Sequence, residues 1–372
     1  MKSCVERRRG DFLGKLASQG HNPSDAPMAT TARKRKIWLR SLVIATLAHV
    51  LLFLVVPVPA QLVETVHARG VFPALRLVLA TPAAAVPFSV GEVMLGAFLL
   101  VGAGAAVQAI AWALGKARSC SLSVVFLWFA IIVTQVYLLG FAWLYRRPSL
   151  AQRMALPEVA GVAAMGEAAT STATAAAAAR CEPGGLTLDQ LDQLAREAIV
   201  GVLPDIAASL PAAGPKRIWP EGALMLFDVA GIFWPFSQEP HVDPGLDRLQ
   251  YAFVACHELA HLAGIASEDE ANFVAWLACT RSPHPFVRYA GHFGALRYFA
   301  ADSPEVWKLA GESVVADMRR LQQRWQRFRS PRAARFRLVI HDAALRSQGE
   351  SRGIESYDDM VRLIVRWQAR GR

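Results

Sequence analysis

Cysteine and charge are both scarce in this chain. Five cysteines in 372 residues exclude a fold that depends on a dense set of disulfides. Charged residues make up 19% and hydrophobic residues 53% of the sequence, a balance too apolar for a typical soluble protein. The net charge of +10 does not indicate nucleic-acid binding, because a basic N-terminal leader carries much of it. No sequence feature supports a nucleotide or nucleic-acid partner.

Long apolar runs account for this composition. Three stretches, at about 41–59, 93–114 and 122–144, are each about long enough to cross a bilayer as a helix. A buried core helix is the alternative for each, and it fits the first stretch best because Pro57 and Pro59 end it. We therefore expect a basic leader at 1–40, a membrane region at 41–147, a linker at 148–183 and a globular domain at 184–372.

The leader predicts the orientation of the chain. It holds ten basic residues against three acidic ones, so the positive-inside rule keeps it in the cytoplasm. Three crossings then place the C-terminal domain outside the cytoplasm, although Arg146 and Arg147 oppose this locally. A cleavable signal peptide is the alternative for the first stretch, but the leader is long for one and a retained anchor is preferred.

A His-Glu-x-x-His string, formed by His257, Glu258 and His261, lies inside an apolar, helix-like stretch. Two imidazoles four residues apart lie on one face of a helix, close enough to bind one zinc ion. The glutamate beside the first histidine can then act on a metal-bound water. A buried helix with hydrogen-bonded histidines is the alternative. It is disfavoured because burying these side chains without strong partners is costly.

A third zinc ligand is expected just beyond Gly264, where the helix can end in a left-handed residue. The segment from Glu268 to Asn272 resembles the Glu-x-x-Ala-Asp signature of the glutamate-liganded zinc peptidases. This resemblance implies that Glu268 binds zinc and that Asn272, where aspartate is usual, orients a ligand histidine. Glu270 is the alternative ligand, and helix capping by these acids is a second alternative.

Two cysteines flank the predicted zinc site. Cys256 precedes the first zinc histidine, and Cys279 ends the helix that Glu268 opens. Antiparallel helices joined by a tight turn could bring these residues together outside the cytoplasm, where disulfides persist. We predict either a Cys256–Cys279 bridge or two small buried thiols.

The rest of the globular domain is expected to be mostly helical. An alanine-rich stretch at 165–180 predicts a tether or a frayed helix, and Thr187 and Gln190 have the spacing of a capping box. Short strands are expected between 216 and 236, around Gly231. They would form either an exposed strand for an extended substrate or an ordinary core hairpin. Residues 235–244 predict a polar loop over the cleft.

Two residues of the helix-like stretch 286–299 are candidates for stabilising a reaction oxyanion. The similarity to glutamate-liganded zinc peptidases, which use a histidine or a tyrosine for this purpose, implies that His292 and Tyr289 are the candidates.

From about residue 38 to 367 the chain resembles one family, the bacterial membrane proteins of domain of unknown function 3810. The segments that carry the resemblance are 87–92, 145–148, 231–236, 255–261, 268–273 and 356–357. The resemblance implies three N-terminal transmembrane helices and a zinc metallopeptidase domain in the bacterial inner membrane.

These observations predict a mainly α protein, with three transmembrane helices followed by an α+β, zincin-like and mostly helical domain that has a short β-hairpin. We expect a membrane-anchored metallopeptidase with one zinc ion, in which His257, His261 and Glu268 are ligands and Glu258 is the base. Its expected partners are a peptide or protein substrate and the lipid bilayer. The alternatives are a catalytically silent, zinc-stabilised envelope sensor or scaffold, and a zinc hydrolase that acts on cell-wall material.

Overall fold

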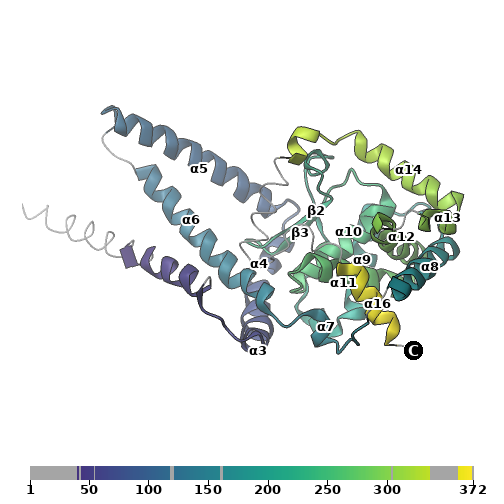
Figure 1. Ribbon diagram of the computed structural model, residues 1–372. Coiled ribbons are helices and arrows are strands. Elements are labelled where there is room, and N and C mark those ends of the chain that lie inside the picture. The colour runs from purple at the N-terminus through teal and green to yellow at the C-terminus, as the bar shows by residue number, and fades with distance from the viewer. Residues whose placement is uncertain are drawn as a thin grey trace, which may run out of the picture. The chain divides into compact units, whose positions relative to one another are not determined.

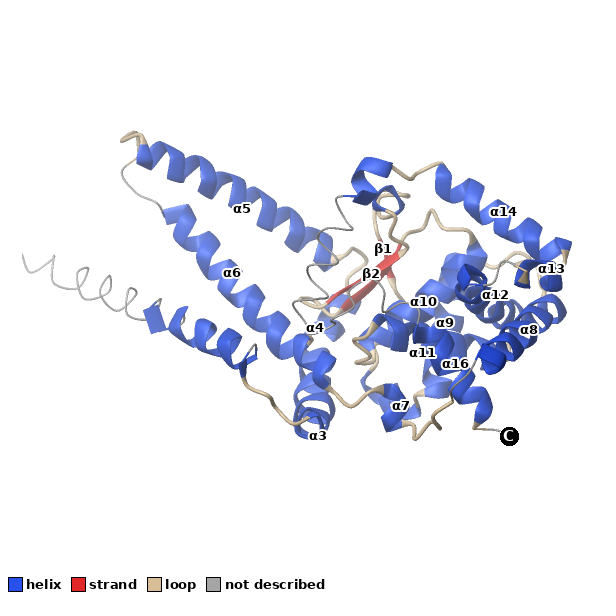
Figure 2. Cartoon of the chain, viewed as in Figure 1, coloured by secondary structure: helices blue, strands red, loops and turns tan. Residues whose placement is uncertain are grey.

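The computed structural model describes residues 40–41, 43–53, 55–117, 121–159, 162–302, 305–335 and 359–370. The chain divides into two compact units, Met1–Val55 and Val56–Arg372. In the first unit, an apolar helix covers Val43–Phe53. The second unit contains all the elements described below and is mainly helical, with one small sheet (Figures 1 and 2).

Two helices are long and apolar enough to cross a membrane: α5 (Val90–Ala113) and α6 (Ser121–Gly140), which continues through the 3-10 turn η2 (Ala142–Arg146). They contact each other through the rings of Phe98 and Phe126, 5.0 Å apart, while many of their other apolar side chains are exposed. The prediction of three such helices is wrong for the described residues. In the first stretch the described residues form the shorter apolar helix Val43–Phe53, and residues 56–59, which include Pro57 and Pro59, are not helical.

The segment between the first two apolar stretches is helical. It comprises α3 (Ala60–Leu62), the π-helix η1 (Val63–Val71) and α4 (Phe72–Ala84), which follow one another without a break. Phe72 and Arg76 of α4 are fully buried. The Arg76 guanidinium donates to the Leu262 carbonyl at 2.9 Å, so this segment is tied to the end of the predicted zinc helix.

The globular core is built around the predicted zinc helix, α10 (Arg248–Leu262), which is buried on nearly every side. It packs against α9 (Leu188–Val202), α11 (Glu268–Arg281) and α12 (Pro285–Asp302) (Figure 1). The predicted capping box at the start of α9 is confirmed: Thr187 Oγ1 accepts from the Gln190 amide at 3.2 Å. The outer elements are α7 (Leu150–Arg153), η3 (Pro204–Ser209), α13 (Val306–Ala310), α14 (Glu312–Gln326) and α16 (Asp359–Ala369).

The alanine-rich stretch is a helix, and the alternative prediction of a tether is wrong. It forms α8 (Val162–Ala179), which packs along α12 and also contacts α13 and α16. Ala173 and Ala176 are fully buried. Small side chains reduce the distance between helix axes, so these alanines let two helix backbones pack closely. From composition alone this stretch resembles a low-complexity segment, because composition does not show the helix against which it packs.

A small three-stranded sheet lies beside α10, with the strand order β1-β3-β2. β1 (Lys216–Arg217) is parallel to the central strand β3 (Glu239–Val242), and β2 (Gly231–Trp234) is antiparallel to it, with Ile232 opposite His241. The predicted strand around Gly231 is confirmed, but Met225–Phe227 forms a 3-10 turn. The loop prediction for 235–244 is wrong, because β3 is a wholly buried strand. Its polar side chains are buried because they have hydrogen-bond partners inside the protein.

Candidate metal centre

The turn after α10 brings a new side chain back to the predicted zinc histidines. Asp247 caps the start of α10 by accepting from the Leu249 amide at 3.0 Å, and the helix ends at Leu262. Gly264 has a φ of 96°, in the left-handed region that glycine tolerates. A side chain there would also meet the Phe72 ring at 2.9 Å. The chain then reverses, and α11 begins at Glu268.

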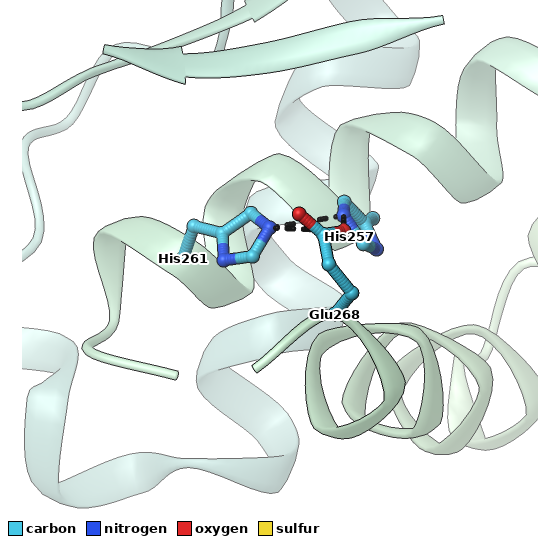
Figure 3. Close-up of side chains that lie close together, drawn as sticks. All are labelled: His257, His261 and Glu268. Atoms are coloured by element: carbon cyan, nitrogen blue, oxygen red, sulfur yellow. Dashed lines mark hydrogen bonds and ion pairs between the residues drawn. The ribbon is translucent and has the colours of Figure 1, made fainter. Parts of the chain in front are cut away.

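Three side chains converge at this turn: His257, His261 and Glu268, hereafter the candidate metal centre (Figure 3). Their potential ligand atoms all lie within 4.8 Å of one another. His257 Nε2 is 3.2 Å and His261 Nε2 is 3.7 Å from the same Glu268 oxygen, and the two Nε2 atoms are 3.0 Å apart. Two imidazoles and one carboxylate with this spacing fit a zinc ion that keeps one position open.

Electrostatics in the centre act in opposite directions on its two histidines. Burial alone would raise the pKa of Glu268, but hydrogen bonds to both histidines hold it well below its ordinary value. Burial lowers the pKa of His257, which favours the neutral imidazole that binds metal. Burial acts the same way on His261, yet the Glu268 carboxylate raises the pKa of His261 to about 9. Metal binding would therefore displace a proton from His261.

Glu258 lies beside the centre without a compensating partner. Its side chain is buried, and its Oε2 has no hydrogen-bond partner. Burial, with a contribution from the Glu268 charge, raises the pKa of Glu258 to about 8, although His261 acts in the opposite direction. A Cβ added to Gly231 of β2 would come within 2.5 Å of Glu258 Oε1. The sheet therefore packs directly against this carboxyl group, and only glycine fits.

Asn272 and Tyr298 lie close to the ligands. Asn272 is buried one turn after Glu268 and lies close to His257 and Tyr298, but its Nδ2 atom and the Nδ1 atom of His257 have no hydrogen-bond partner. Tyr298 is not among the residues predicted from the sequence, although a signal for it exists. Gly291 and Gly294 allow α12 to approach Cys279 of α11 and Phe253 of α10. Tyr298 follows at the i, i+3, i+7 spacing that shares their helix face.

The structure does not place the two predicted oxyanion residues with the three clustered side chains. The Tyr289 hydroxyl donates to Asp317 Oδ2 at 2.6 Å and is buried there. His292 is half-buried, and both burial and the charge of Arg288 lower its pKa. The Tyr289 hydroxyl is therefore already paired with Asp317, whereas Tyr298 on the same helix lies close to Asn272 and Glu268.

Glu270, the alternative ligand, is engaged elsewhere. Its Oε2 accepts from Arg153 Nη2 at 2.8 Å, and its Oε1 accepts from the Leu150 amide at the start of α7. Glu270 thus joins α11 to α7. Of the two glutamates, the structure places only Glu268 with the histidines.

The two predicted partner cysteines are close together and buried. The Sγ atoms of Cys256 and Cys279 are 3.4 Å apart, and both residues are free thiols in this structure. The helix pairing expected from the sequence is present, and the bridge itself stays a prediction.

Comparison with known proteins gives one result. No curated protein and no solved structure matches the chain. Residues 67–365 match a family described as a protein of unknown function, DUF3810. The match covers the elements from η1 to α16, including the candidate metal centre, whereas segment 356–357 lies outside the described residues. The chain belongs to the DUF3810 family.

Proposed function

We propose that this protein is a membrane-anchored, zinc-dependent metallopeptidase. One observation carries the proposal: His257, His261 and Glu268 converge on one point, with the unpartnered carboxyl group of Glu258 beside them. Buried polar groups are normally paired, so an unpaired acid next to three metal-ligating side chains supports a functional site.

The residues present fit zinc and suggest a division of roles. A zinc ion held by His257, His261 and Glu268 would supply Lewis acidity towards water and a carbonyl oxygen. Asn272 is the proposed outer partner of His257, since it is buried next to this histidine and the Nδ1 atom of His257 has no other hydrogen-bond partner. Zinc fits these ligands better than magnesium or calcium, because two of the three are imidazoles.

Glu258 is proposed as the general base and then the general acid. Its buried carboxyl group follows His257 directly in the sequence, and its unpaired Oε2 is free to exchange a proton with a water at the centre. The ionised carboxylate takes a proton from the attacking water. The protonated form then donates to the leaving amine nitrogen as the carbon–nitrogen bond breaks. Tyr298 is the proposed hydrogen-bond donor to the oxyanion.

An edge strand supports a peptide as the substrate. β2 lies at the edge of the sheet, and its Gly231 packs against Glu258. An extended peptide can add to such an edge through backbone hydrogen bonds, which would place its carbonyl groups beside the base. The side chain of Ile232 is 37% exposed and would line this edge.

Membrane anchoring is proposed for α5 and α6. The number of crossings decides where the domain lies: two place it on the same face as the leader, whereas a further crossing within 41–59 places it on the opposite face, outside the cytoplasm of a bacterial cell. Cys181 is a free, half-exposed thiol of the domain. Its labelling in intact cells by a membrane-impermeant thiol reagent identifies the outer face.

Metal analysis of the detergent-solubilised protein tests the function. We expect one zinc ion in the wild type, in Glu258→Gln and in the control His292→Ala, and none in His257→Ala. Envelope proteins that are cleaved in wild-type cells should accumulate in cells carrying Glu258→Gln or His257→Ala. Wild-type cleavage by Glu258→Gln would remove the proposed base. Zinc binding without any Glu258-dependent cleavage would favour a silent scaffold.

A further inference from the structure

The end of α6 contacts the candidate metal centre directly. Phe141 follows the last residue of α6, and its ring centroid lies 6.1 Å from that of His261. The same ring lies 5.1 Å from Phe233 of β2, which is itself 6.2 Å from His261. A ligand histidine and the residue that leaves the membrane-length helix therefore share one aromatic cluster, with no linker between them.

The start of α5 is fixed to the central strand of the sheet. The Ser89 hydroxyl, which caps α5, lies 2.7 Å from His241 Nε2. Glu239 accepts hydrogen bonds from the Gly91 amide at 2.7 Å and from the Val90 amide at 3.1 Å. All of these side chains are buried. Since β3 pairs with β2, only the sheet separates the first turn of α5 from Glu258.

Two arginines, Arg76 and Arg147, fix the turn that carries the third ligand. Arg147, just after η2, donates to the Gly264 carbonyl at 2.7 Å and pairs with Glu64 at 2.7 Å. Arg76 donates to the Leu262 carbonyl. The turn between α10 and α11 is thus held from the side of the membrane-length helices. These contacts fix the distance between the candidate metal centre and the ends of the membrane-length helices.

Two exposed aromatic residues lie close to the start of α5. Trp219 is 81% exposed, and its backbone amide donates to Glu92 in the first turn of α5 at 3.1 Å. Phe88, two residues before α5, is 54% exposed. Large aromatic residues at the end of a membrane span are typical of the headgroup region. Both residues fit the headgroup region at the start of α5.

We infer that the substrate is the membrane-proximal, extended segment of a membrane-anchored polypeptide; this inference rests on the proposed peptidase function. The sheet separates α5 from Glu258, and neighbouring strands lie about 5 Å apart, so the centre is on the order of 10–15 Å from the bilayer surface. An extended chain spans that distance with about three to five residues. Water adds across a peptide bond close to the anchor, giving a carboxylic acid on one product and an amine on the other.

Reconstituted full-length protein with anchored reporters tests this inference. Each reporter carries one transmembrane anchor, a Gly/Ser spacer and a randomised octapeptide, and new termini are identified by mass spectrometry. We expect Glu258-dependent cleavage within about ten residues of the anchor. Cleavage should be at least tenfold slower with a forty-residue spacer or with the same octapeptides free in solution.

The outcomes separate the two proposals. Glu258-dependent cleavage at equal rates for all spacers and for free peptides would overturn the membrane-proximal substrate and leave the peptidase function intact. Absence of Glu258-dependent cleavage for every reporter would overturn the peptidase function and the inference with it.

A surface substitution gives a second measurement. Trp219→Ser should lower the cleavage rate of the short-spacer reporter several-fold, because it removes an interfacial anchor, and leave the rate for free peptides unchanged. Leu309→Ser is the matched control, since Leu309 is 55% exposed on α13. Equal rates for the two variants on the short-spacer reporter would contradict the interfacial position of Trp219.

Discussion

Two buried polar clusters in this protein differ in how completely their charges are paired. In the Asp317 cluster, both carboxylate oxygens have partners: Tyr289 and Arg180 on Oδ2, and Arg180 and Arg320 on Oδ1. At the candidate metal centre, by contrast, Glu258 Oε2 has no partner.

This difference is consistent with a structural role for the Asp317 cluster and supports the proposed functional role of the candidate metal centre. The Asp317 cluster joins α12 and α14 to the end of α8 through charge-assisted hydrogen bonds that are complete within the protein. The metal centre keeps an incomplete set of interactions, which a cation and a reacting group would complete. Local rules of pairing are commonly violated at functional sites, where the rest of the fold holds the arrangement in place.

The largest contrast is expected between the two glutamates of the first turn of α11. Glu268→Gln should lower zinc affinity by more than the roughly 10- to 100-fold typical of losing an outer partner, because it removes a charged ligand. Glu270→Gln should keep zinc affinity and lower the free energy of unfolding by about 1–3 kcal/mol, because Arg153 loses its partner. Zinc titration by calorimetry and thermal unfolding measure the two effects. Equal zinc affinity in both variants would exclude Glu268 from the centre.

The Asp317 cluster is expected to affect stability alone. Asp317→Asn should lower the free energy of unfolding by about 3 kcal/mol, with no change in zinc content or in cleavage per folded molecule. Burial raises the pKa of Asp317, but Tyr289, Arg180 and Arg320 together lower it below its ordinary value of 3.8.

The sign of the pH dependence follows from this lowered pKa. The stabilisation is present above pH 3.8 and is lost as the pH falls through the folded-state pKa. Denaturant unfolding of wild type and Asp317→Asn from pH 7 to pH 3 should show the two curves converging. A constant difference across this range would contradict the ionic origin.

Gly231 tests how closely the sheet positions the base. Gly231→Ala should displace Glu258 and slow cleavage by on the order of 100-fold, as a misplacement of about 1 Å can. Zinc content should not change, since Gly231 does not contact the ligands. Gly201→Ala is the control: a Cβ there meets no atom within 4 Å. It should stabilise α9 by about 0.5–1 kcal/mol. A wild-type rate for Gly231→Ala would show that Glu258 can move without loss.

The smallest contrast is expected between two tyrosines of α12. Tyr298→Phe should lower kcat about tenfold by removing a donor to the oxyanion, with unchanged stability. Tyr289→Phe should lower the free energy of unfolding by about 1 kcal/mol with unchanged kcat. Steady-state kinetics on a cleaved reporter, together with thermal unfolding, measures both. A lowered kcat in Tyr289→Phe, with an unchanged kcat in Tyr298→Phe, would identify Tyr289 as the catalytic tyrosine instead.

The parts that the sequence predicts are those fixed by local spacing. The pair His257 and His261 lies on one helix face, and Gly264 allows the turn that brings Glu268 back. The mainly helical character of the chain, the strand at Gly231 and the capping box of α9 depend on equally local patterns. Composition also predicts the two membrane-length helices, α5 and α6, among the three that were expected.

The rest depends on partners distant in the sequence. β3 resembles a polar loop because the groups that pair with Glu239 and His241 lie about 150 residues earlier, at the start of α5. α8 resembles a tether because its alanines become informative only against α12. Helix periodicity alone does not separate Tyr298 from Tyr289, because it does not show which face of α12 meets Asp317.

The contact of Phe141 with His261 has a practical consequence for preparing this protein. A soluble fragment cut after the last membrane-length helix, at residue 148, would lose Phe141, Arg147 and Arg76 together. The aromatic wall beside one histidine and both hydrogen bonds to the 262–264 turn would disappear with them. The helices that resemble a detachable anchor are part of the walls of the site, so purification must keep the chain in detergent or lipid from end to end.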